Sequence, residues 1–269
     1  MWPDLHALVP LLAVIGFFSC VGPLMSRHNT ACRLLVVGLV AAVLTHYLAW
    51  RIPVTLLPAD ELSAQSLWVW FLFAIEMLAL VDAVILFATL LRRTNRSPEA
   101  DAHETRLRAC DPADLPSVDV FIATYNEPVE VLEKTIVGAL CIDWPRRQLN
   151  VYVLDDGNRP WLADLARDKG ARYLTREGNA HAKAGNINAA IQRTDGDYFL
   201  ILDADFIPRR DILYRMIGFF EDPKVAIVQA PHNFFNHDPM QANLALRRTL
   251  PDDQRLFFDE IMAGRDGWD

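Results

Sequence analysis

The chain has 269 residues, which allows one large domain or two modest ones. A formal net charge of −8 argues against a nucleic-acid partner, because phosphate binding needs a basic face. Its four cysteines include no Cys-x-x-Cys pair, which gives little support to a zinc site. The hydrophobic fraction of 52% is high for a soluble protein, and almost all of the excess lies before Leu91.

Three apolar stretches, Leu5–Met25, Cys32–Trp50 and Leu67–Leu91, are each long enough to cross a hydrocarbon core of ~30 Å as a helix. We therefore expect residues 1–91 to form three transmembrane helices. The flanking charges give the orientation, because arginine and lysine favour the cytoplasmic side. The first loop is basic, with Arg27, His28 and Arg33. The segment after the third stretch is also basic, with Arg92, Arg93 and Arg96. The second loop is partly acidic, with Asp60 and Glu61 against Arg51. The N-terminus is then outside and everything after Arg92 is cytosolic.

Two carboxylates, Glu76 and Asp82, lie well inside the third stretch. A lone charge in lipid is costly, so each should face protein or water. The residues leave open a polar pathway through the bundle, a hydrogen bond between helices and a protonated acid.

The remainder of the chain reads as a linker followed by an α/β domain. Residues 92–117 are polar and contain three prolines, which indicates a linker or a surface helix. From residue 118 onward, apolar β-rich runs alternate with segments of helical spacing, which predicts a mostly parallel sheet covered on both faces. The predicted strands are Val118–Thr124, Leu149–Leu154, Arg172–Leu174, Tyr198–Leu202 and Val225–Gln229.

Polar clusters follow three of these strands, and ligands of such sheets bind at the carboxyl ends of the strands. Asp203 and Asp205 stand one residue apart after a strand, where both could reach Mg²⁺ or Mn²⁺, which prefer oxygen ligands. A solvated strand end is the alternative. Asp155 and Asp156, followed by Gly157, could accept a hydrogen bond from a base, or could form a simple turn.

Two further segments complete a possible nucleotide-sugar site. His181–Asn186 precedes a helix and contains Lys183, a flexible point charge suited to a phosphate, although a plain capped helix start would look the same. Thr124–Pro128 supplies Tyr125, which could stack on a base, and Glu127 beside it. A metal held here would stabilise a departing diphosphate. No Walker loop and no Gly-x-Gly-x-x-Gly occurs, which disfavours ATP hydrolysis and hydride transfer.

These motifs, together with the run Gln229–Phe235, resemble in order and spacing the inverting family 2 glycosyltransferases, and most closely the bacterial cellulose synthase catalytic subunits. The resemblance implies a GT-A fold over residues 118–269 and a UDP-glucose donor, with Thr124, Glu127 and His181 among the residues around the substrate. It assigns Tyr125, Asp155 and Asp156 to uridine. It assigns Lys183 to the diphosphate, and Asp203 and Asp205 to Mg²⁺ or Mn²⁺.

The same resemblance implies a multi-pass protein of the bacterial inner membrane with a cytosolic catalytic domain. The partners it implies are a growing β-1,4-glucan, the lipid bilayer and other cellulose synthase subunits, with no nucleic acid. A synthase of another polysaccharide, such as curdlan, chitin, hyaluronan or mannan, is the alternative.

Two departures from the family pattern concern catalysis. Phe206 stands where the family often has histidine. The later Thr-Glu-Asp, whose aspartate is the family's general base, and the Gln-x-x-Arg-Trp that grips the product do not occur in this sequence. The catalytic residue is therefore unknown. We expect the GT-A domain to be incomplete at its C-terminus and the chain alone to make no polymer. A truncated, inactive nucleotide-binding or membrane fragment is a further alternative.

Overall fold

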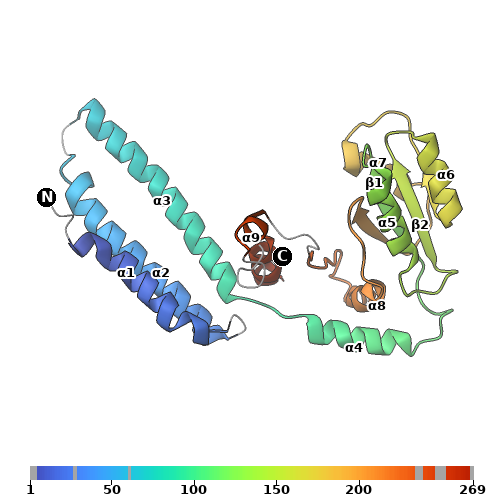
Figure 1. Cartoon of the computed structure of the whole chain (residues 1–269), viewed down its shortest axis with the longest axis horizontal. Helices are drawn as coiled ribbons and strands as arrows, with labels where there is room; N and C mark the ends of the chain where they lie inside the picture. The colour runs from blue at the N-terminus through green and yellow to red at the C-terminus, as the bar shows by residue number, and fades with distance from the viewer. Residues whose placement is uncertain (1–4, 27–28, 60–61, 234–238, 246–252, 267–269) are drawn as a thin grey trace. The chain divides into compact units, whose positions relative to one another are not determined.

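The computed structural model describes residues 5–26, 29–59, 62–233, 239–245 and 253–266. It divides into two units, one formed by Met1–Asn95 with Pro231–Asp269 and the other by Arg96–Ala230. The first unit is mainly helical and the second is an α/β domain (Figure 1).

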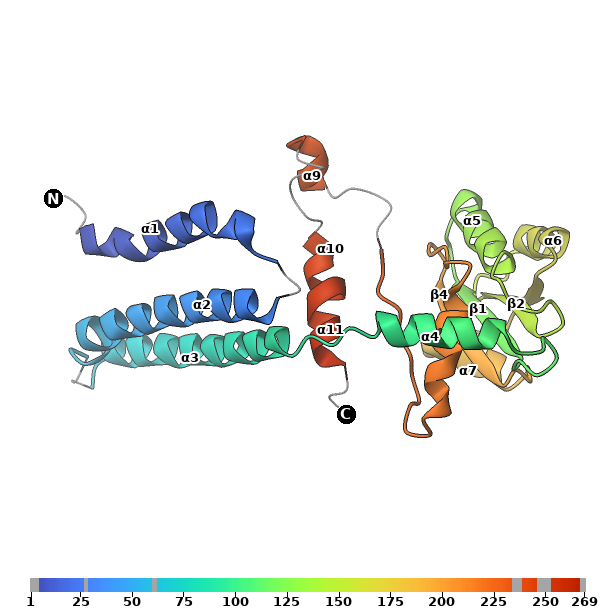
Figure 2. The same ribbon diagram turned by 90° about the horizontal axis from the view of Figure 1, so that it is seen from below.

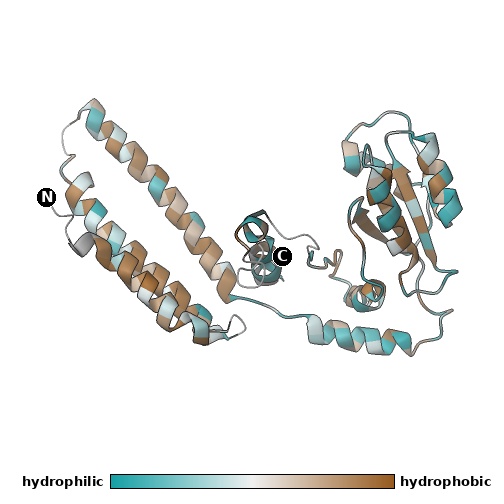
Figure 3. Ribbon diagram, viewed as in Figure 1, coloured by the Kyte–Doolittle hydropathy of each residue, from teal (hydrophilic) through white to brown (hydrophobic). Residues whose placement is uncertain are grey.

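Apolar helices dominate the first unit, and they appear as brown ribbons when coloured by hydropathy (Figure 3). The N-terminal helices are α1 (Leu5–Cys20), α2 (Thr30–Arg51) and α3 (Ala64–Leu91). Two spans, Thr30–Leu56 and Ala64–Leu91, are long and apolar enough to cross a membrane by length and composition. The first expected span is not one continuous helix, because α1 ends at Cys20 and only a short 3-10 turn, Gly22–Leu24, follows it.

Helices α2 and α3 lie side by side (Figure 2) and are joined by an ion pair. Arg51 Nε and Nη2 donate to the two carboxylate oxygens of Glu76 at 2.9 and 3.0 Å, and the Tyr47 hydroxyl donates to the same carboxylate at 2.9 Å. Of the three alternatives for Glu76, the structure therefore favours a hydrogen-bonded contact between helices. Such pairing lowers the cost of a carboxylate in an apolar helix.

Short C-terminal helices complete the first unit. They are α9 (Pro239–Asn243), α10 (Asp253–Arg255), a π-helical turn (Leu256–Ile261) and α11 (Met262–Arg265). The last of these meets the end of α3, where the Thr94 amide donates to the Ala263 carbonyl at 2.9 Å. Arg93 also forms an ion pair with Glu260 at 3.4 Å.

The second unit is built on a parallel sheet of order β3-β2-β1-β4. Its strands are β1 (Val118–Thr124), β2 (Leu149–Asp155), β3 (Arg172–Leu174) and β4 (Tyr198–Asp203). Its helices are α4 (Ser97–Arg108), α5 (Val129–Leu140), α6 (Pro160–Lys169), α7 (Ala182–Ile191) and α8 (Ile212–Met216), followed by a 3-10 turn (Ile217–Glu221). The predicted α/β class with a parallel sheet is confirmed.

Alternation along the strands gives the sheet two apolar faces, and both are covered. One face packs Val120 and Ile122 against Leu132 of α5 and Leu162 of α6. The other face packs Phe121 and its neighbours against α7. Strand β4 lies at the edge of the described sheet, and its Phe199 and Ile201 remain about half exposed, at 50% and 43%.

The structure contradicts one predicted strand and adds detail to the expected linker or surface helix. Val225–Gln229 was predicted to be a strand, but these residues form no ladder, and Ile227 is 85% exposed. That prediction was wrong, because an apolar run becomes a strand only where a partner edge receives it. Helix α4 lies within the expected linker and packs on the α/β unit, with Leu107 in the core and Arg215 of α8 paired to Asp101 and Glu104.

Candidate functional site

The strand register brings the predicted site residues to one edge of the sheet. Thr124 at the end of β1 pairs with Asp155 at the end of β2. Ala123 pairs with Asp203 at the end of β4. Because all three strands run parallel, the loops that follow them meet at this carboxyl edge.

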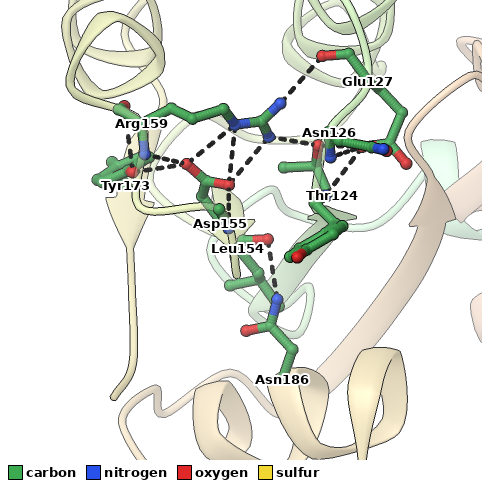
Figure 4. A network of polar contacts seen from close by, with 10 residues as sticks. Thr124, Asn126, Glu127, Leu154, Asp155, Arg159, Tyr173 and Asn186 are labelled. Carbon is green, nitrogen blue, oxygen red and sulfur yellow. Dashed lines mark hydrogen bonds and ion pairs between the residues drawn. The ribbon is translucent and has the colours of Figure 1, made fainter. Parts of the chain in front are cut away.

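Asp155 is the most deeply buried acid of this edge, with no exposed side-chain surface. Its Oδ1 accepts from Arg159 Nη2 at 2.9 Å and from the Gly157 amide at 2.8 Å. Its Oδ2 accepts from the Arg159 amide at 2.7 Å and the Tyr173 hydroxyl at 2.8 Å (Figure 4). Both oxygens are thus occupied by protein donors, so Asp155 acts here as an anchor for the loop after β2.

The same guanidinium joins this loop to the one after β1. Arg159 Nη2 donates to the Thr124 hydroxyl at 2.7 Å, and Nη1 donates to the Glu127 carbonyl at 3.0 Å (Figure 4). The Glu127 carboxylate in turn accepts from the Thr124 hydroxyl and from the Tyr125 amide at 2.9 Å. These bonds shape the turn and leave the Tyr125 ring 55% exposed.

Gly157 allows the two loops to approach closely. A Cβ atom at this position would lie 2.3 Å from the Tyr125 carbonyl oxygen, a distance at which backbone would have to move. Any side chain here would therefore separate the loop after β2 from the loop after β1.

Hydrogen bonding lowers the pKa of Asp155, which is buried, and of Glu127, which is half-buried. Burial alone would raise the pKa of Asp155, but the bonds from Arg159, Tyr173 and Gly157 outweigh it and hold the pKa below its ordinary value. Burial alone would also raise the pKa of Glu127. The hydrogen bonds from the Thr124 hydroxyl and from nearby backbone amides outweigh burial, so the pKa of Glu127 is lowered as well.

This arrangement predicts an acid-sensitive domain. A depressed carboxylate pKa contributes stability that is complete above the unfolded pKa of about 4 and is lost as pH falls through the folded value. We therefore expect the urea concentration at the unfolding midpoint of the α/β unit to decrease when the pH is lowered below about 4. Hydrogen exchange of the β2 amides, measured in the whole chain, reports this midpoint. Asp155→Asn should flatten this dependence, whereas Asp164→Asn, at an exposed ion pair on α6, should leave it unchanged. Equal slopes in all three proteins would contradict the assignment.

Asp156 is paired with a different arginine. Arg176 Nε and Nη2 donate to its two oxygens at 2.7 and 2.8 Å, and the Asp156 side chain is only 6% exposed. Arg176 follows β3. The two aspartates of the Asp-Asp-Gly motif are therefore each held by a different guanidinium, Asp155 by that of Arg159 and Asp156 by that of Arg176.

Lys183, Asp203 at the end of β4 and Asp205 just after it form the outer part of the site. Lys183 Nζ contacts Asp203 Oδ1 in an ion pair. Asp205 is exposed and has no hydrogen bond or ion pair to another described residue. No group of three or more histidine, cysteine or acidic side chains gathers anywhere in the described part of the chain. Two carboxylates suit Mg²⁺ nonetheless, since this ion usually takes one or two of them and completes its shell with water and phosphate oxygens.

Several contributors were not singled out from the sequence, namely Arg159, Tyr173 and Arg176. Only Arg159 had a local signal, because it stands four residues after Asp155. Asn186, expected where a helix begins, lies instead inside α7 and is buried, donating to the Leu154 carbonyl at 2.9 Å. His181 is exposed and stands at the N-cap position of α7, where its side chain makes no capping hydrogen bond. Of the predicted run Gln229–Phe235, Phe234 and Phe235 lie outside the described residues.

Comparison with known proteins agrees with these motifs. Residues 119–265 match the family model "Glycosyl transferase family 2". Cellulose synthase 1 of Komagataeibacter xylinus is 37% identical over 268 residues, which cover 99% of this chain and 16% of that protein. The UDP-forming cellulose synthase catalytic subunit of Xanthomonas axonopodis pv. citri is 38% identical over 252 residues, covering 93% of this chain and 33% of that protein. This chain thus spans about a sixth to a third of the length of these relatives.

Among solved structures, the mannosyltransferase PcManGT from Pyrobaculum calidifontis, in complex with GDP-Man and Mn²⁺, has a TM-score of 0.42 and 24% identity. The match covers 64% of this chain and 50% of that one. The resemblance to bacterial cellulose synthase catalytic subunits is confirmed by the curated relatives, and the family match covers more than half of the sequence. The chain belongs to glycosyl transferase family 2.

Proposed function

We propose that this chain carries the donor site of a membrane-bound, processive glycosyltransferase that transfers glucose from UDP-glucose to a growing β-1,4-glucan. The observation that supports it best is the meeting of Lys183 with Asp203 at the end of β4, beside the exposed Asp205. A lysine and two carboxylates at one strand end are what a metal-bound diphosphate requires. The relatives named as UDP-forming cellulose synthases favour uridine and glucose.

In this proposal each side chain has a physical task. The exposed Tyr125 stacks on the uracil, and Asp156 lies beside the uracil. Asp155 holds the loops that form the base pocket. Lys183 moves from Asp203 to the diphosphate. Asp203 and Asp205 hold Mg²⁺ or Mn²⁺, which supplies Lewis-acid stabilisation of the leaving diphosphate when bound. Deprotonation of the acceptor hydroxyl is assigned to no residue of this chain.

The proposal includes location and partners. The protein would be a multi-pass protein of the bacterial inner membrane, with the α/β unit in the cytosol and the glucan leaving through the membrane part. Two helices that are long and apolar enough to cross a membrane support this location. Other cellulose synthase subunits are the expected protein partners.

Donor binding tests the proposal directly. The whole chain in lipid nanodiscs should bind UDP in the presence of Mg²⁺, and UDP-glucose should compete for the same site, whereas GDP-mannose should not. Calorimetry with each nucleotide in turn measures this. Preferential competition by UDP-N-acetylglucosamine would favour the alternative of a chitin or hyaluronan synthase. Absence of binding by every uridine nucleotide would overturn the proposal.

A further inference from the structure

Arg176 lies near the start of the loop that leads from β3 to Lys183. We propose that Arg176 is a positioning residue: it fastens this loop to Asp156 and thereby affects the affinity for the diphosphate more than the affinity for the base. The inference rests on the proposed nucleotide-sugar function and assigns a task to a residue outside the motifs on which that function was argued.

The contacts of Arg176 connect two parts of the site. Its guanidinium holds Asp156 through both oxygens, at 2.7 and 2.8 Å. It also donates to the Ala180 carbonyl at 2.8 Å and to the Ala182 carbonyl at 2.9 Å. The side chain is only 14% exposed. One planar donor group therefore ties the end of β2 to the residues immediately before Lys183.

The loop needs such support because its backbone is unusual. His181 has φ of 61° and Ala182 has φ of 44°, so two consecutive residues with side chains adopt the left-handed region. Residues in that region persist when the surrounding structure determines them. The two carbonyls that Arg176 binds, those of Ala180 and Ala182, flank His181.

Gly185 provides an independent indication of the same arrangement. A Cβ atom here would lie 2.1 Å from the Ala180 carbonyl oxygen and 2.6 Å from Arg176 Nη1. The first turn of α7 therefore has room for the guanidinium and its carbonyl partner only because residue 185 has no side chain.

The consequence for the ligand follows from the place of Lys183. This residue comes directly after the fastened loop, and its Nζ reaches Asp203 at the end of β4. Asp156 directly follows β2 and Asp203 is the last residue of β4, and β1 lies between these two strands. Arg176 thus links the loop beside the expected base to Lys183, the side chain expected to bind the diphosphate. Loss of Arg176 should release Lys183 without disturbing Asp155 and Tyr125.

The test compares two ligands that differ only in the diphosphate. Uridine and UDP, each with Mg²⁺, are titrated into the whole chain in nanodiscs. We expect Arg176→Ala and Gly185→Ala to weaken UDP binding tenfold or more. Gly185→Ala should change uridine binding less than twofold, whereas Arg176→Ala, which also removes the partner of Asp156, should weaken uridine binding by a clearly smaller factor than UDP binding. Arg176→Lys keeps the charge but loses the planar fork of the guanidinium, so it should weaken UDP binding nearly as much as Arg176→Ala does. Lys183→Ala should have a smaller effect on UDP in the Arg176→Ala background than in the wild type. Arg167→Ala, an exposed arginine of α6, is the matched control and should change neither affinity.

Equal losses for uridine and UDP, or no loss for UDP, would overturn the inference while leaving the donor site in place. A second readout needs no nucleotide. Hydrogen exchange of the amides at 179–185 should accelerate in Arg176→Lys and Gly185→Ala relative to the Arg167→Ala control, and unchanged exchange would equally overturn the inference. Failure of the wild-type chain to bind UDP would overturn the proposed function, and the exchange experiment would still decide whether Arg176 holds the loop.

Discussion

Replacing Asp203 by asparagine is expected to weaken Mg²⁺-dependent UDP binding by well over tenfold, which corresponds to about 1.4 kcal/mol or more. The change keeps the shape of the side chain and removes the charge that a divalent cation requires. Calorimetric titration of UDP with and without Mg²⁺ measures the effect. Asp195→Asn, at an exposed acid before the start of β4, is the matched control and should bind as the wild type does.

Asp205→Asn separates the metal from the ion pair. Lys183 contacts Asp203, whereas Asp205 has no ion pair among the described residues. If both acids hold the cation, the two variants should lose similar factors, and only in the presence of Mg²⁺. A loss confined to Asp203→Asn, or one that persists without metal, would instead assign the effect to the lysine partner and would refute the metal site.

Arg159→Ala should produce the largest loss of stability, about 3–5 kcal/mol in the free energy of unfolding. The variant leaves the Asp155 carboxylate fully buried without its charged partner and removes the donor to Thr124 and to the Glu127 carbonyl. Hydrogen exchange of the β2 amides against urea, in the whole chain, reports on this unit. Arg167→Ala, on the same helix α6 but exposed, should cost no more than about 0.5 kcal/mol.

A double variant checks the cause. Asp155→Asn removes the charge that Arg159 neutralises, so Arg159→Ala should cost less in that background than in the wild type. Additive losses would show that Arg159 stabilises the domain through other contacts, and the account of Asp155 as a buried anchor would then fail.

The sheet and the edge that carries the site could be predicted because both follow from local patterns. Apolar β-rich runs gave β1 and β3 with the observed bounds, and parallel strands necessarily bring their carboxyl ends together. The two arginines could not be found in this way. Arg176 reaches Asp156 across 20 residues of sequence, and only the folded chain determines which charges meet. Val225–Gln229 shows the opposite failure, since its composition fits a strand but says nothing about a partner.

The bare edge of the sheet has a practical consequence for anyone preparing this protein. In the part of the chain that the structure describes, β4 pairs only with β1, so its other edge is unpaired, and its side chains Phe199 and Ile201 are about half exposed. Edge strands with apolar side chains recruit strands from other molecules, which leads to precipitation. Recombinant yield should therefore depend on dilution and on the rate of synthesis more than on the detergent that receives the helices. A lysine in place of Phe199, four residues before Asp203 on β4, would act as a gatekeeper against this self-association.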